Sequence, residues 1–166
     1  MEWKVGVLTI SDKGSRGERE DQSGVVLQEL VQGINGQITA YEIIPDEQPL
    51  IEQKMIELSD QRHCELILTT GGTGFAARDV TPEATKAVID KEAPGLAERM
   101  RAATLVHTKF AILSRATSGI RGNTLIINLP GSPKGVRECF ESIQDVLPHA
   151  LQILRGNTEH EGGVTK

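Results

Sequence analysis

Short apolar segments alternate with segments of helical spacing along most of the chain, and this alternation constrains the fold more than any other feature. Residues 4–10 are β-branched and almost continuously apolar, which is typical of a parallel strand buried on both faces. Repeated strand–helix units predict an α/β fold, a three-layer αβα sandwich around a mostly parallel sheet. We expect strands at residues 4–10, 37–44, 65–70, 110–114 and 123–129.

Length and composition fit one globular unit with an aliphatic core. The chain has 166 residues, of which 38% are hydrophobic and only 3% aromatic. We expect one domain over residues 1–156 and a flexible polar tail over residues 157–166, which are rich in glycine and charge. The net charge of -5 and the scarcity of aromatic stacking platforms argue against nucleic acid as a partner.

The cysteines, histidines and apolar runs indicate no structural metal and no membrane contact. Cys64 and Cys139 lie in no metal-binding or redox spacing, so we expect two reduced thiols in a cytoplasmic protein. The four histidines share no ligand spacing, and the longest apolar runs are far too short to cross a bilayer.

Four polar loops are expected at one edge of the predicted sheet. They follow the strand ends at Ile10, Ile44, Thr70 and Leu129. Because ligands of open α/β sheets bind beyond the carboxyl ends of the strands, these loops are the expected walls of a single site.

A glycine-rich turn follows the predicted strand at 65–70. Residues 71–74 read Gly-Gly-Thr-Gly, and successive backbone N–H groups of such a turn can converge on an anion. Thr70 and Thr73 add hydroxyl groups to this turn. The sequence has neither the Gly-Lys-Ser/Thr of a phosphate-binding Walker loop nor the spacing of a dinucleotide fingerprint. A plain tight turn is the alternative, but three glycines in four positions favour a cradle for a small anionic ligand.

Two aspartates are candidate ligands for Mg²⁺. Asp79 precedes a helix start that we expect Thr81 to cap, with Pro82 at the first helical position. That arrangement leaves the Asp79 carboxylate available to hold Mg²⁺ between phosphate oxygens. Asp46 lies in the loop after Ile44, where its spacing alone favours a structural Asx turn.

Other polar residues of these loops have two interpretations each. Ser132 precedes Pro133 at an expected helix start, so it either caps that helix or contacts an anion at the helix N-terminus. Further candidate donors, each also compatible with a turn or surface role, are Ser11, Asp12, Arg78, Ser114 and Arg115.

These motifs resemble those of the molybdopterin-binding domain family, in which they occur in the same order. The matching strings are Thr-Thr-Gly-Gly-Thr-Gly at 69–74, Arg-Asp-Val-Thr-Pro at 78–82, Pro-Gly-Leu-Ala-Glu at 94–98 and Asn-Leu-Pro-Gly-Ser-Pro at 128–133. The resemblance covers roughly residues 4–155. Within the family the chain is similar to the stand-alone molybdopterin adenylyltransferases of molybdenum cofactor biosynthesis (MogA/MoaB type).

The resemblance implies an activity and a set of partners. Family members join molybdopterin and ATP into adenylyl-molybdopterin, release pyrophosphate, use Mg²⁺ and commonly assemble as trimers. The two catalytic aspartates of the family match Asp46 and Asp79, so the resemblance changes the interpretation of Asp46 from structural to functional. A downstream molybdenum-insertion protein is a further expected partner.

Three alternatives to this activity stay open on the sequence alone. They are a non-catalytic molybdopterin-binding or carrier protein, a related nucleotide pyrophosphatase, and a purely structural interaction module. In each ligand-binding case, contacts are expected from Ser11, Asp12, Thr70, Gly71, Gly72, Thr73, Gly74, Arg78, Ser114, Arg115, Pro130, Gly131 and Ser132.

Overall fold

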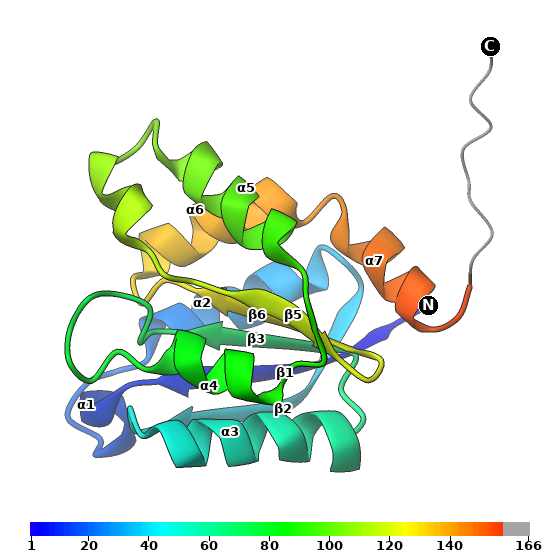
Figure 1. Cartoon of the computed structure of the whole chain (residues 1–166), viewed down its shortest axis with the longest axis horizontal. Coiled ribbons are helices and arrows are strands. Elements are labelled where there is room, and N and C mark those ends of the chain that lie inside the picture. Colours follow the sequence, from blue (N-terminus) through cyan, green and yellow to red (C-terminus); the bar gives the residue numbers. More distant parts are fainter. Residues whose placement is uncertain (158–166) are drawn as a thin grey trace.

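A six-stranded sheet in the order β2-β1-β3-β6-β5-β4 forms the centre of the molecule, as the computed structural model shows for residues 1–157 (Figure 1). The four strands β2, β1, β3 and β6 run parallel, and β5 and β4 add an antiparallel edge. The sheet is therefore mostly parallel, as predicted. The strands are β1 (Trp3–Ile10), β2 (Gly36–Ile44), β3 (Leu66–Thr70), β4 (Lys91–Glu92), β5 (Ser118–Arg121) and β6 (Thr124–Leu129).

Helices cover both faces of the sheet, which makes the three predicted layers (Figure 1). One face packs against α2, α5, α6 and α7, and the other against α3, η1 and α4. The helices are α1 (Asp12–Ser15), α2 (Gln22–Gln32), α3 (Gln48–Ile56), the π-helical turn η1 (Glu57–Gln61), α4 (Thr81–Val88), α5 (Pro94–Thr104), the 3₁₀ helix η2 (Lys109–Leu113), α6 (Pro133–Ile143) and α7 (Leu147–Leu154).

Alternate side chains of the parallel strands β1, β3 and β6 enter the two cores. In β1, Val5 and Val7 contact the core under α2 and α6, whereas Leu8 and Ile10 contact the core under α3 and α4. All four side chains are almost completely buried. Burial on both faces explains why these strands are nearly continuous apolar runs rather than alternating ones.

The predicted strand at 110–114 is wrong, because this segment forms the 3₁₀ helix η2 instead. Phe110 and Ile112 are 64% and 65% exposed, so their side chains do not enter a core as they would in a two-faced sheet. The strand lies later in the chain, at β5, which pairs with β6 around a turn that contains Gly122 at φ +55°. A Gly-Asn turn between two short strands is a recognised hairpin signal, and the alternation pattern alone does not reveal it.

Strand register brings the predicted polar loops to one edge. Ile10 of β1 pairs with Ile44 of β2, Thr9 pairs with Thr70, and Thr70 pairs with Leu129 of β6. The four chain segments that leave these strands therefore begin side by side, as the sequence predicted.

The structure also bears on the expectations for the cysteines, for membrane spans, for one helix end and for the tail. Cys64 and Cys139 are free thiols, as expected, and both are buried. Within residues 1–157, no helix combines the length and the apolar character that a membrane crossing requires. The helix expected to reach about residue 91 ends at Val88, because Lys91 and Glu92 pair with β5. The predicted tail at 157–166 falls, apart from Asn157, outside the described residues.

Candidate active site

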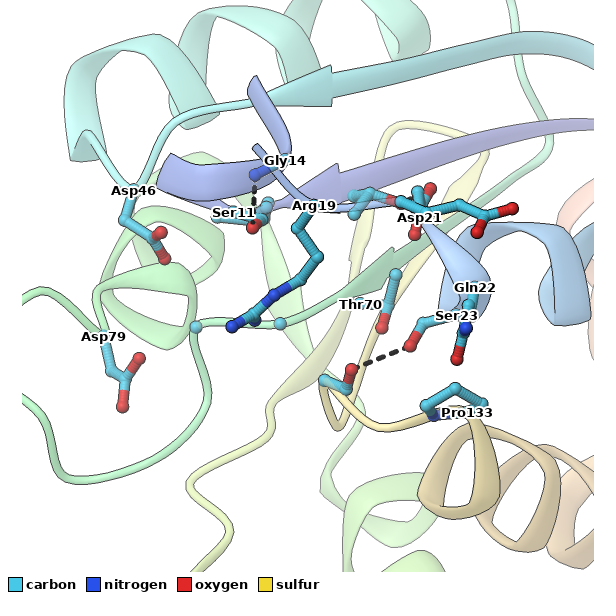
Figure 2. A pocket seen from close by; sticks show the side chains of 16 residues that line it. Ser11, Gly14, Arg19, Asp21, Gln22, Ser23, Asp46, Thr70, Asp79 and Pro133 are labelled. Atoms are coloured by element: carbon cyan, nitrogen blue, oxygen red, sulfur yellow. Dashed lines mark hydrogen bonds between the residues drawn. The ribbon is translucent and has the colours of Figure 1, made fainter. Parts of the chain in front are cut away.

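A polar cavity of about 570 Å³ lies at the carboxyl edge of the sheet (Figure 2). Its walls come from the loops that follow β1, β2, β3 and β6, together with the start of α2. The lining residues are Thr9, Ile10, Ser11, Gly14, Arg19, Glu20, Asp21, Gln22, Ser23, Asp46, Thr70, Gly71, Gly72, Asp79, Gly131 and Pro133.

The glycine turn after β3 requires glycine for both conformation and space. Gly71 and Gly72 have φ values of +98° and +69°, which side chains other than glycine rarely adopt. A Cβ on Gly71 would clash with the Ile10 carbonyl, and one on Gly72 would clash with Thr81 Oγ1. A Cβ on Gly74 would come within 2.8 Å of Asp79 Oδ2. The glycines therefore let the turn pack directly against the end of β1 and against the segment from Asp79 to Thr81.

Several groups of this turn are used inside the protein. The Gly71 N–H donates to the Leu129 carbonyl at 3.2 Å, and Thr70 Oγ1 donates to the Pro130 carbonyl at 2.7 Å. These two bonds join the β3 loop to the β6 loop. In residues 1–157, the backbone N–H groups of Gly72 and Thr73 make no protein hydrogen bond. The predicted anion cradle therefore loses the Gly71 N–H and the Thr70 hydroxyl as donors, but it keeps the N–H groups of Gly72 and Thr73.

Asp46 is fixed in the cavity wall by reciprocal bonds with Asp12. The Asp12 N–H donates to Asp46 Oδ2 at 2.9 Å, and the Asp46 N–H donates to Asp12 Oδ1 at 3.0 Å. Arg78 donates two bonds to the Asp12 carboxylate, at 2.6 and 3.0 Å, and holds the pKa of Asp12 below its usual value. Asp12 and Arg78 thus support Asp46, and neither is among the cavity-lining residues.

The electrostatic environment of Asp46 favours the protonated carboxyl. Burial raises the pKa of Asp46, and the negative charges of Asp12 and Asp79 raise it further, against the bond from the Asp12 N–H and the charge of Arg78. A cation placed among these carboxylates would offset that cost. The donor set therefore fits a hard cation that also binds ligand oxygens.

Asp79 lines the same side of the cavity as Asp46 (Figure 2). Its Oδ2 accepts from the Ala76 N–H at 3.0 Å, so the carboxylate braces the loop before α4. The expected capping of α4 by Thr81 is wrong: Val80 occupies the N-cap position, and Thr81 Oγ1 donates to the Gly71 carbonyl at 2.9 Å. Thr81 therefore fastens the glycine turn to α4 instead of closing the helix end.

A second cavity of about 290 Å³ lies beyond the glycine turn and the β6 loop. It brings together the predicted residues Thr73, Gly74, Ser114, Pro130 and Ser132 with apolar side chains of α5 and η2. Most of the predicted site residues thus divide between two cavities, whereas Asp12, Arg78 and Arg115 line neither. The capping interpretation of Ser132 is confirmed, since its Oγ accepts from the Gly135 N–H at 3.0 Å.

Arg115 holds the loop between the two cavities. Its guanidinium donates to the carbonyls of Gly74 and Asp79, both at 2.7 Å, and pairs with Glu83. The Arg115 N–H also donates to the Thr73 carbonyl at 2.8 Å. These contacts make Arg115 a support for the glycine turn.

Sequence reasoning predicted the loop after β1 as a wall of the site, but it did not single out three residues between α1 and the start of α2. Arg19, Asp21 and Ser23 line the first cavity. Asp21 does cap α2 through the Gly24 N–H at 2.9 Å, and it also accepts from Thr9 Oγ1 at 2.6 Å. The sequence signal that could have identified these three residues is their position, because they follow the carboxyl end of β1.

Tyr41 completes the contacts of Asp21. Its hydroxyl donates to the Asp21 carboxylate, and burial, followed by that carboxylate, raises the pKa of Tyr41 to about 12. The phenol is therefore a neutral donor that holds Asp21 at the cavity wall.

Fold and site together define a class: an α/β protein with a ligand cavity at the carboxyl ends of its parallel strands. The family model described as "Probable molybdopterin binding domain" matches residues 6–149. The chain belongs to this molybdopterin-binding domain family, as its motifs predicted.

Individual relatives agree with this assignment over nearly the full chain. The molybdopterin adenylyltransferase of Helicobacter pylori (strain J99) is 47% identical over 155 residues, which are 92% of this chain and 88% of the relative. That of Escherichia coli (strain K12) is 42% identical over 169 aligned positions, covering 92% and 86%. The crystal structure of the molybdopterin biosynthesis enzyme MoaB from Thermus thermophilus has a TM-score of 0.88 and 51% identity, and covers 93% and 97%.

Gly72→Ala is expected to destabilise the protein by about 1–3 kcal/mol, because alanine at this positive φ is strained and its Cβ meets Thr81. The matched control is Gly95→Ala, since a Cβ at Gly95 meets nothing within 4 Å. Urea denaturation of both variants measures the difference, and equal midpoints would contradict the strained geometry.

The raised pKa of Asp46 predicts a pH-dependent penalty on the ligand-free fold. A raised folded-state pKa means that stability is present below the ordinary aspartate pKa and is lost as pH rises through the raised value. Asp46→Asn removes this ionisation, so the variant should gain stability relative to the parent chain as pH rises through that window.

Denaturation of both proteins between about pH 3 and pH 7, without divalent cations, measures this difference. A stability difference that stays constant over the range would show that Asp46 ionises in the folded protein as it does in the unfolded chain.

Proposed function

We propose that the chain is a molybdopterin adenylyltransferase, which transfers AMP from ATP to molybdopterin and releases pyrophosphate. The observation that carries this proposal is the cavity in which Asp46, Asp79 and the Gly71–Gly72 turn meet. It lies in a chain that is 47% identical to a curated molybdopterin adenylyltransferase over almost its whole length.

We assign Mg²⁺ to the Asp46 and Asp79 carboxylates. Mg²⁺ commonly binds through one or two carboxylates together with substrate phosphates and water. No cluster of three or more histidine, cysteine or acidic side chains suited to a metal occurs in residues 1–157, so the fit is to a cation shared with a bound phosphate. When bound, the ion supplies neutralisation of the phosphate charges.

The reaction is a displacement at the α-phosphorus of ATP. An oxygen of the molybdopterin phosphate forms the new bond to phosphorus, the bond to the bridging oxygen of the β-phosphate breaks, and pyrophosphate leaves with the electron pair. Such a transfer depends on positioning and charge neutralisation, and it needs no covalent enzyme group. The contribution of this chain is a rigid wall: Asp12 and Arg78 fix Asp46, and Arg115 fixes the backbone at Asp79.

Two adjoining cavities suit a reaction of two ligands. The first is lined by acidic and polar groups, and the second combines Thr73, Ser114 and Ser132 with apolar side chains such as Met100 and Leu113. The β6 loop lines both, through Gly131 in one and Pro130 in the other. We propose that the two cavities hold the two reactants, with the transfer taking place at the glycine turn between them.

Asp46→Asn and Asp79→Asn should each lower the rate of AMP transfer at least about a hundredfold, because each removes a charge that the reaction needs. Molybdopterin binding should persist. Asp145→Asn, at an exposed carboxylate on the connection between α6 and α7, is the matched control and should keep full activity. An assay with molybdopterin, ATP and Mg²⁺, read by product mass, measures the change.

Together with measurements of ligand binding and of dinucleotide hydrolysis, this assay separates the alternative functions. Molybdopterin binding without ATP-dependent product would identify a carrier, and AMP release from dinucleotides without molybdopterin would identify a pyrophosphatase. Binding of neither ligand would identify an interaction module.

We propose a homotrimer, in keeping with the resemblance to trimeric family members. Supporting this, an apolar surface extends from the end of α5 into η2. Its exposed residues are Leu105, Val106, Phe110, Ile112 and Leu113. Phe110 and Leu113 also line the second cavity, so assembly over this surface would bring a neighbouring copy close to the site.

Sedimentation equilibrium should give the mass of three chains. Ile112→Asp should lower that mass, because it places a charge on the apolar surface. Val25→Asp, at a half-exposed valine on α2, is the control and should leave the mass unchanged. A monomer in the parent protein would contradict the trimer.

Two further parts of the proposal concern the cell. The buried free thiols of Cys64 and Cys139 agree with a reducing compartment, so we place the enzyme in the cytoplasm. The adenylylated product would pass to a downstream molybdenum-insertion protein.

A further inference from the structure

One basic side chain lies in the first cavity and has no role so far. Arg19 comes from the loop between α1 and α2, and Figure 2 shows its side chain reaching into the space that Asp46, Asp79 and Thr70 line. The other charged lining residues are acidic: Glu20, Asp21, Asp46 and Asp79. Arg19 is thus the only cation among the lining residues that the structure describes.

Within residues 1–157, Arg19 differs from the other arginines around the site in having no protein partner. Arg78 is bound to Asp12, Arg115 to Glu83 and two carbonyls, and Arg16 to Glu18. Over residues 1–157, neither an ion pair nor a side-chain hydrogen bond joins Arg19 to another residue. Its five N–H donors therefore remain available to a ligand.

The backbone on both sides of Arg19 is held in place. On one side, the Gly17 N–H donates to the Gly14 carbonyl at 3.1 Å, and the Glu18 N–H donates to the Lys13 carbonyl at 2.9 Å. On the other side, Asp21 is bound to Thr9 and Tyr41. The loop thus has a fixed course over the cavity, and Arg19 enters it from a defined wall.

An anionic ligand needs a cation in this cavity. Four acidic side chains oppose a phosphate group there, and the Gly71 N–H and the Thr70 hydroxyl are already used in internal bonds. The Gly72 N–H stays available, but as a neutral donor it does not offset that charge. The planar guanidinium of arginine matches two phosphate oxygens with two parallel hydrogen bonds.

We propose that Arg19 is a substrate-binding residue that grips a phosphate group of the reacting ligands. This inference rests on the proposed function, whose two substrates both carry phosphate. In the transfer, the guanidinium holds that phosphate in line with its neighbour and offsets its negative charge against the acidic wall. No atom is exchanged with Arg19, and the bonds made and broken are those of the displacement at the α-phosphorus.

The test compares Arg19→Met with Arg16→Met in the full-length protein. Both substitutions remove one positive charge from the same exposed loop, but Arg16 is paired with Glu18 and does not line the cavity. KM is measured separately for ATP and for molybdopterin. Arg19→Met should raise the KM of one substrate about ten- to a hundredfold, as expected for a lost charge-assisted bond, and Arg16→Met should raise neither.

The two KM measurements, one for ATP and one for molybdopterin, identify which substrate carries the bound phosphate. A rise confined to ATP places Arg19 on the nucleotide, and a rise confined to molybdopterin places it on the pterin phosphate. Arg19→Lys should recover part of the loss, because lysine keeps the charge but lacks the forked geometry. Equal behaviour of Arg19→Met and Arg16→Met in both arms would overturn the proposal.

Calorimetric binding separates this inference from the proposed function. The probes are molybdopterin and an ATP analogue with a methylene group between its α- and β-phosphates, with Mg²⁺ present. If the parent chain forms no product but Arg19→Met still weakens binding of either probe at least tenfold, the adenylyl transfer is refuted and the phosphate contact stands. If the parent chain binds neither probe, the phosphate contact is refuted as well.

Discussion

The two-sided burial of the parallel sheet is the constraint on which the rest of the structure depends. Val5, Leu8 and Leu68 are inaccessible to solvent, and so are most of their neighbours, which leaves no surface for chemistry along the strands. Polar residues can face a ligand only where the strands stop. Since β1, β2, β3 and β6 are parallel, their carboxyl ends stop at the same edge, and one cavity collects the loops of all four.

Hydrogen bonds between these loops convert that edge into a rigid site. Thr70 and Gly71 join the β3 loop to the β6 loop, and Asp12 joins the β1 loop to Asp46 after β2. Asn128 adds a buried link, because its amide donates to Thr69 at 3.1 Å and to Thr85 at 2.9 Å. Thr70, Gly71 and Asn128 of the family motifs thus hold other parts of the site in place.

Sequence patterns predicted the parts of this arrangement that depend on local chemistry. Apolar periodicity located β1, β3 and β6, and glycine spacing located the turn that needs positive φ at Gly71. Two predictions failed because their outcome depends on tertiary contacts. Residues 110–114 are apolar enough for a strand, but they do not pair with the sheet and form a 3₁₀ helix instead. The Thr81 hydroxyl donates to the Gly71 carbonyl and does not cap its own helix. Arg19 was missed for a related reason, since a lone arginine in a charged loop carries no local signal.

Charge explains why the cavity combines an acidic wall with one arginine that has no partner among residues 1–157. Four carboxylates without compensation would repel any phosphate, and an entirely basic cavity would offer no oxygen ligands to a hard cation. The raised pKa of Asp46 shows that burial, followed by the charges of Asp12 and Asp79, already opposes a negative charge there in the ligand-free wall. In the proposed complex, a metal-bound phosphate would lower that cost on the side of Asp46 and Asp79, while Arg19 would offset phosphate charge from the opposite loop. Metal and anionic ligand are therefore favoured together rather than separately, because each offsets the charge that opposes the other.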